Sequence, residues 1–198
     1  MNRVTRLEFG LLAGGAWRPL DEVTGRAPEL VSSWLAEDRL SCCSFQGGFF
    51  IDIDGEPWSD DGTVDEYWMT VSWFAALAAL LGGEETFGPT SGPWEESQLV
   101  WRREGDDVVM EDIHHSGSVA MKKVRVPLRP LAERVAAEGR RFLTLAVAIG
   151  AEVVRRRVAG EGDGEKLDEI ERNLVEVAPQ MAEGIEAIER ALAHSRAG

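Results

Sequence analysis

The stretch KKVRVPLRPLAERVAAEGRRFLTLAVAI, residues 122–149, changes its pattern partway through, and this change decides the fold class. Up to Leu128, apolar and basic residues alternate, as in a strand with one buried face. From Pro130 onward, the apolar residues recur at the period of a helix: Leu131, Val135, Phe142, Leu145 and Ile149. We therefore expect a strand that is followed directly by a long helix, which continues to about Arg157.

Downstream of this helix, a glycine-rich break at residues 159–164 precedes a second apolar stripe. Its members are spaced by three or four residues, as in a coiled-coil seam: Leu167, Ile170, Leu174, Val177, Met181, Ile185, Ile188 and Leu192. Because the break is short, the two helices are predicted to form an antiparallel hairpin, with Pro179 kinking or restarting the second helix. The acids that open the second helix would then lie near Arg155–Arg157. In the alternative, the helix over 165–192 joins a second copy of the chain.

Upstream, most apolar runs are short and alternate with polar residues, which predicts strands. We expect strands over Leu7–Leu12, Phe49–Asp54 and Glu66–Val71, and a hairpin of Gln98–Arg102 with Val108–Ile113. Short helices are predicted after Pro28 and over Trp73–Leu81, the second with an earlier start as the alternative. Trp17 and Pro19 are predicted to lead into a loop, and further loops are predicted at Glu56–Val64 and Glu84–Glu96.

Together these elements predict an α+β fold. An antiparallel or mixed sheet of five or six strands would occupy residues 1–127 with covering helices, and a long helical hairpin would occupy residues 128–198. The hairpin would pack on the sheet, either as a second unit or as part of one continuous domain. A chain of 198 residues with 44% hydrophobic residues can form a real core, so intrinsic disorder is excluded for the chain as a whole.

The first residues, the lengths of the apolar runs and the cysteines bear on the cellular compartment of the protein. The first residues do not resemble a signal peptide, and no apolar run approaches the roughly 18 residues that a membrane span needs. The cysteines, Cys42 and Cys43, are adjacent, which gives neither a disulfide framework nor the spacing of a metal site. They are interpreted as reduced residues of a cytoplasmic protein, with a strained vicinal disulfide as the alternative.

Residues 40–101, here called the base-free stretch, contain eleven carboxylates and no lysine or arginine. They contribute −11 to the net charge of −14, whereas residues 1–39 contribute −1 and residues 102–198 contribute −2. Such an acidic field would repel the phosphates of nucleic acids and of anionic membranes, so both are excluded as direct partners. Basic proteins or cations are favoured instead.

The acidic loop of this stretch and its neighbours are the candidate binding surface. Asp52 and Asp54 alternate with isoleucines and are expected to project together from the wetter face of a strand. Trp58 and Trp94 lie beside prolines and carboxylates, as interface anchors do, although burial in the core is the alternative for both. The predicted partner-binding residues are Asp52, Asp54, Glu56, Trp58, Asp60, Asp61, Asp65, Glu66, Trp94, Glu95 and Glu96.

The function that fits this surface best is that of a non-enzymatic bacterial immunity or antitoxin-like inhibitor, which covers the basic cleft of a nuclease toxin. One alternative is a metal-assisted hydrolase that uses Glu111, Asp112, His114 and His115. Another is an assembly protein that uses the C-terminal helices. A calcium loop of EF-hand type is disfavoured because Pro57 stands where glycine is required. Nucleophile-elbow and phosphate-loop motifs are absent from the sequence, and no cofactor is expected.

Overall fold

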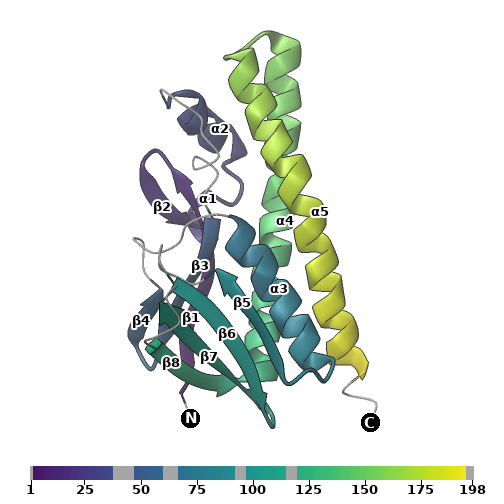
Figure 1. The fold of residues 1–198 in the computed structure, drawn as a ribbon. Coiled ribbons are helices and arrows are strands. Elements are labelled where there is room, and N and C mark those ends of the chain that lie inside the picture. The colour runs from purple at the N-terminus through teal and green to yellow at the C-terminus, as the bar shows by residue number, and fades with distance from the viewer. Residues whose placement is uncertain (1, 38–46, 60–66, 92–96, 115–119, 195–198) are drawn as a thin grey trace.

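The computed structural model describes residues 2–37, 47–59, 67–91, 97–114 and 120–194. Within these residues, eight strands form two antiparallel four-stranded sheets, and five helices accompany them. Two long C-terminal helices stand side by side and extend well beyond the sheets (Figure 1). The α+β class and the helical hairpin are confirmed. The strands, however, belong to two sheets, where the sequence predicts one sheet of five or six strands.

The first sheet has the strand order β2-β1-β3-β4. Its central strands are β1 (Val4–Ala13) and β3 (Gly47–Ile53), which place Phe9 opposite Phe49. The edge strands are β2 (Ala16–Pro19) and β4 (Glu56–Ser59), each four residues long. Strand β4 lies in a segment that was predicted to be a loop, so that prediction is wrong for its residues. Strand β2 contains Trp17 and Pro19, which were predicted only to lead into a loop.

The second sheet has the order β5-β6-β7-β8 and contains the predicted hairpin. Strands β6 (Ser97–Glu104) and β7 (Asp107–His114) pair with Trp101 opposite Met110, and the hairpin is confirmed. The edge strands are β5 (Thr86–Ser91), which replaces part of the predicted loop, and β8 (Ala120–Pro127). The face that holds Trp101 and Met110 is buried.

Proline distinguishes the edge strands from the central strands in both sheets. Each edge strand carries one proline: Pro19 in β2, Pro57 in β4, Pro89 in β5 and Pro127 in β8. Strands β1, β3, β6 and β7 contain none. Proline has no N–H to donate, so it cannot take part in a ladder that bonds on both sides. The positions of these four prolines therefore agree with the strand order.

Three shorter helices contribute to the core. The helices α1 (Leu20–Val23) and α2 (Ala27–Leu35) follow the β1–β2 hairpin, and α2 confirms the helix predicted after Pro28. The third, α3 (Tyr67–Leu81), includes residues that were predicted to form a strand, so the alternative with an earlier start holds. Its sequence is apolar on nearly all sides, as in helices surrounded by protein. An apolar run of this kind can imitate strand alternation by accident.

The helical hairpin consists of α4 (Leu128–Ala159) and α5 (Gly164–His194). Gly160, in a left-handed conformation with φ of 67°, ends α4, and Arg156 and Arg157 occupy its last turn. All eight seam residues of α5 are buried within the chain, so intramolecular packing accounts for the seam. Pro179 lies inside α5, and the helix continues through it without restarting.

Phe74 of α3 joins the two long helices to the rest of the core. Its side chain lies very close to two glycines of the long helices. A Cβ atom added to Gly139 would lie 2.7 Å from the Phe74 side chain, and one added to Gly184 would lie 2.5 Å from it. Phe142 of α4 packs against Phe9 of β1 with ring centroids 4.9 Å apart. The buried apolar residues of the sheets and of the helical hairpin form one continuous cluster.

The long helix α4 also covers an open edge of β1, since β2 pairs only with residues 10–13. The Phe9 backbone N–H donates to Glu138 Oε2 at 3.1 Å, and Arg134 donates to the Val4 carbonyl at 2.9 Å. Side chains of α4 thus satisfy backbone groups that no neighbouring strand reaches.

Candidate functional site

The structure describes one part of the predicted binding surface, at the end of the first sheet where β3 turns into β4. Asp52, Asp54, Glu56 and Trp58 belong to this part. The remaining predicted residues lie outside the described residues: Asp60, Asp61, Asp65, Glu66, Trp94, Glu95 and Glu96. The following geometry therefore concerns the four residues on β3, β4 and the turn between them.

Asp52 lies on the outer face of the first sheet, which is the side opposite the buried Ile51 and Ile53. Its cross-strand partner is Arg6, whose guanidinium pairs with Glu8 at 2.9 Å and lies 5.2 Å from the centroid of the Phe50 ring. Trp17 meets the same ring edge-to-face at 5.8 Å. The outer face around Asp52 therefore combines aromatic rings with charges of both signs.

Asp54 occupies the turn between β3 and β4, with a φ of 56°. Its carboxylate accepts hydrogen bonds from the Asn2 amide and the Arg3 backbone N–H, both at 2.8 Å. These bonds hold the pKa of the Asp54 carboxyl below its ordinary value. Asp54 thus attaches the start of β1 to the turn, and its surroundings differ from those of Asp52.

Trp58 is only 1% exposed, so the core alternative describes its position. Its ring centroid lies 6.0 Å from that of Trp73, which in turn meets Trp101 edge-to-face at 5.0 Å. These three indoles form a buried cluster between the two sheets and α3. The described residues that remain accessible to a partner are the acids, with Glu56 exposed at the start of β4.

Cations from distant parts of the chain approach this region. Besides Arg6, the ammonium group of Lys122 on β8 donates to the Pro57 carbonyl at 2.7 Å. A pocket of about 410 Å³ beside the start of β1 is lined in part by Arg3 and Arg134. A stretch that lacks bases in the sequence is therefore not free of bases in space.

Among the residues that the structure describes, the carboxylates of the base-free stretch form ion pairs less often than those of the helical hairpin, where most acids, though not all, pair with an arginine. Within the described residues, Asp52, Glu56, Glu84 and Glu85 form no ion pair. By contrast, acids of the helical hairpin pair repeatedly with arginines of α4, as in the contacts of Arg157 with Asp168 at 2.7 Å and with Glu171 at 2.8 Å.

The two described carboxylates of the hydrolase alternative, Glu111 and Asp112, do not converge. Glu111 faces outward and pairs with Lys123 at 3.6 Å, whereas Asp112 is fully buried on the opposite face of β7. Neighbouring residues of a strand point to opposite faces, so these two carboxylates cannot serve one metal ion. The side chains of His114 and His115 lie outside the described residues. Among the described side chains, no group of three or more potential ligands is placed to hold a metal ion.

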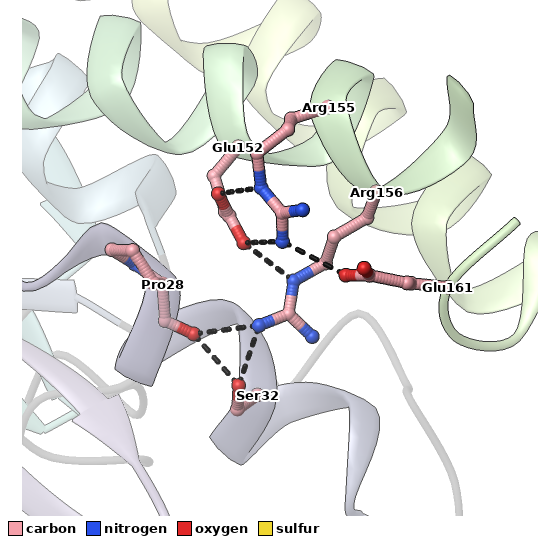
Figure 2. A network of polar contacts seen from close by, with 6 residues as sticks. All are labelled: Pro28, Ser32, Glu152, Arg155, Arg156 and Glu161. Carbon is pink, nitrogen blue, oxygen red and sulfur yellow. Dashed lines mark hydrogen bonds and ion pairs between the residues drawn. The ribbon is translucent and has the colours of Figure 1, made fainter. Parts of the chain in front are cut away.

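Sequence reasoning missed Glu152, the centre of a polar network between α4 and α2 (Figure 2). Glu152 is 7% exposed and accepts hydrogen bonds from Arg155 and Arg156. Arg156 also donates hydrogen bonds to the Pro28 carbonyl at 3.0 Å and to Ser32 Oγ at 2.6 Å. The two arginines lower the pKa of Glu152 to about 2. The signal was present in the sequence as a Glu followed by Arg three and four residues later.

This network is structural in character, because each of its charged groups is already paired. Arg155 also pairs with Glu161 at 2.9 Å, which connects the network to the segment that leads into α5. The predicted proximity of the basic run to the acids around the start of the second helix is thereby confirmed, as Glu161 and Asp168 both contact it.

Comparisons with protein-family models, with curated proteins and with solved structures returned no match for this chain. None of the described helices combines the length and the apolar character that crossing a membrane requires.

Proposed function

We propose that this chain is a non-enzymatic binding protein of the immunity or antitoxin type, which uses the acids of the base-free stretch to cover a basic surface on a nuclease toxin. One observation carries the proposal: residues 40–101 concentrate eleven carboxylates without a lysine or arginine. The lack of ion pairs at the described acids of this stretch supports it. The proposal places the protein in the bacterial cytoplasm, where it would meet its toxin before export.

The physical basis is mimicry of a phosphate backbone. A nuclease cleft is built to attract phosphates, so an array of carboxylates can occupy it and exclude the substrate. Carboxylates that lack internal partners keep their full charge available for this purpose, and long-range attraction then accelerates association. Arg6 and Lys122 border the described part of the surface and would limit the basic patch that it can accept.

Charge reversal tests the proposal. If a neighbouring gene encodes a nuclease, the variant Asp60→Lys/Asp61→Lys should slow association with that nuclease by at least tenfold at low salt, and it should weaken inhibition of the nuclease. Association rates at low and high salt, together with a nuclease assay, provide the measurement.

A matched control is Glu176→Lys/Glu183→Lys, which makes the same change in net charge at two exposed positions of α5. This control should retain nearly all of the association rate. Equal slowing in both variants would show a general effect of net charge and would contradict the proposed surface. A neighbouring gene product without nuclease activity would contradict the proposed partner.

A further inference from the structure

The outer side of the helical hairpin carries an apolar face that nothing within the described chain covers. Four large apolar side chains are exposed in the part of the chain that the structure describes, and all four are valines of α4 and α5: Val147 at 75%, Val154 at 50%, Val158 at 85% and Val175 at 69%. An isolated exposed valine needs no explanation, but a set confined to two adjacent helices does.

The three valines of α4 lie along one stripe of that helix. Val147 and Val154 are seven residues apart, and Val158 follows four residues later. The exposed Ala151 falls between the first two, so the intervals are four, three and four. This is the spacing of a coiled-coil seam, here on the side of α4 that faces away from the core.

Ion pairs between the helices place Val175 on the same side. Arg157, three residues after Val154, pairs with Asp168 and Glu171 of α5. Val175 follows Glu171 by four residues, so the two share one face of α5. The exposed valines of both helices therefore border the same groove, with these ion pairs across it.

The opposite groove of the hairpin is already filled by α2. The Glu152 network fastens α2 to α4, and Lys166 of α5 donates to the Leu35 carbonyl at 2.9 Å. The upper parts of α4 and α5 rise beyond both sheets, so the sheets do not cover the valine groove (Figure 1). Within the described residues, this groove is the uncovered side of the helical pair.

The charges along the groove point to a second copy of this chain as the occupant. The α4 side carries Arg140 and Arg157, and the α5 side carries the acids Asp168, Glu171 and Glu189, which pair with these arginines within the chain, together with Arg172, which pairs with Glu169. A twofold axis parallel to the helices places α4 of one copy across from α5 of the other. Each basic row then faces an acidic row, and Val154 meets the Val175 region of the other copy.

The distribution of charge permits this approach. Residues 102–198 contribute only −2 to the net charge, and the −11 of the base-free stretch resides in a different part of the chain. Two copies can therefore bring their helical hairpins together without juxtaposing their most acidic segments. We propose that the valine face of α4 and α5 is the interface of a symmetric dimer that pairs two hairpins as a four-helix bundle.

The test is sedimentation velocity of the full chain across micromolar concentrations, with the variant Val154→Glu/Val158→Glu. The unmodified chain should sediment as a dimer, and the variant should raise the dissociation constant at least tenfold. The new carboxylates would face Asp168 and Glu171 of the other copy. A second variant, Val175→Arg, should weaken the dimer similarly, because it places a cation beside Arg157 of the other copy.

The matched control is Ala137→Glu/Ala148→Glu, which adds the same charge at two exposed positions of α4. These alanines are eleven residues apart, or about three turns, so they share a face that is turned about 100° from Val147. The control should remain a dimer. Circular dichroism verifies that each variant keeps its helices.

A chain that remains monomeric at every concentration would overturn the proposal and leave the valine face to a different protein. A dimer that Val154→Glu/Val158→Glu and Val175→Arg leave intact would equally overturn it. A dimer weakened as much by the alanine control as by the valine variants would place the interface elsewhere.

Discussion

The helical hairpin and the base-free stretch differ in how often their charged side chains pair. In the hairpin, acids and bases are nearly balanced, and most of the acids pair with arginines: Arg140 with Glu189, Arg157 with Asp168 and Glu171, and Arg155 with Glu152 and Glu161. In the base-free stretch, the described acids Asp52, Glu56, Glu84 and Glu85 form no ion pair. Charge therefore supports the fold in the hairpin. In the base-free stretch, Asp54 is held by hydrogen bonds from Asn2 and Arg3, and the other described acids have no paired cation.

The same comparison separates two kinds of residue within the base-free stretch. Its aromatic residues Trp58 and Trp73 are buried, whereas Glu56 is exposed. A surface inferred from composition thus contains residues that belong to the core and residues that are free to bind. Mutations can distinguish the two kinds, because only substitutions of the buried residues should lower the stability of the fold.

Trp58→Ala should have the largest effect on stability. Removing a buried indole leaves a cavity in the cluster with Trp73 and Trp101, so the free energy of unfolding should fall by about 3–5 kcal/mol. Urea denaturation followed by circular dichroism measures the loss. Trp58→Phe, which keeps much of the ring, should lose less. A loss below about 1 kcal/mol for Trp58→Ala would contradict burial of Trp58 in the core and would favour its alternative role as an interface anchor.

Gly184→Ala should have the next largest effect, because it acts where the hairpin meets the base-free stretch. Its Cβ would lie 2.5 Å from the Cβ of Phe74, so α5 and α3 must separate, at a cost of about 1–3 kcal/mol. Gly150→Ala in α4 is the control, since no atom lies near its Cβ and alanine favours helices. Equal stability changes in both variants would show that Phe74 does not tie the helices together.

Glu152→Gln should destabilise the protein by about 1–3 kcal/mol, since it removes the carboxylate that Arg155 and Arg156 share and leaves Arg155 with Glu161 alone. The pKa of Glu152 is lowered from 4.5 to about 2 in the folded protein. Its ionised form therefore stabilises the fold above the unfolded pKa, and this contribution is lost as the pH falls from about 4.5 to 2.

Melting temperatures recorded between neutral pH and pH 2 provide the measurement for Glu152. The difference between the unmodified chain and Glu152→Gln should narrow over the acidic end of this range. A difference that is independent of pH would contradict the assignment, because it would show that the charge of Glu152 contributes nothing to stability.

The smallest effect is expected for Asp52→Asn/Glu56→Gln, which removes two acids that have no ion pair. Stability should change by less than about 0.5 kcal/mol, with a slight gain because self-repulsion falls. Asp168→Asn/Glu171→Gln removes two paired acids of the hairpin and should lose about 0.5–1 kcal/mol instead. Chemical denaturation of both variants compares the two regions directly. Similar losses of stability in the two variants would contradict the difference between the two regions.

Sequence periodicity was sufficient for the helical hairpin and for the β6–β7 pair, where apolar intervals are regular over many residues. It failed at β2, β4 and β5, because each is short and contains a proline, which in isolation indicates a loop. It also misjudged the start of α3, because a helix that is apolar on nearly all sides has no periodic signal. The division into two sheets depends on strand pairing between distant segments, which local patterns do not encode.

The candidate site was predictable in its charge and much less so in its geometry. The concentration of acids is evident from the sequence, yet the contacts of Lys122 with Pro57 and of Asp54 with Asn2 join residues more than fifty positions apart. Arg6 lies opposite Asp52 only because β1 pairs with β3. Local charge counts describe a segment, whereas a binding surface is assembled from several.

The prolines of the four edge strands limit the ways in which another chain can attach. An exposed strand edge normally offers a row of unpaired N–H and C=O groups, onto which a further strand can add. Here each described edge strand contains a proline, which has no backbone N–H to donate to an added strand, and β2 and β4 are only four residues long. Extension of either sheet by a peptide, or by growth into fibres, is therefore disfavoured.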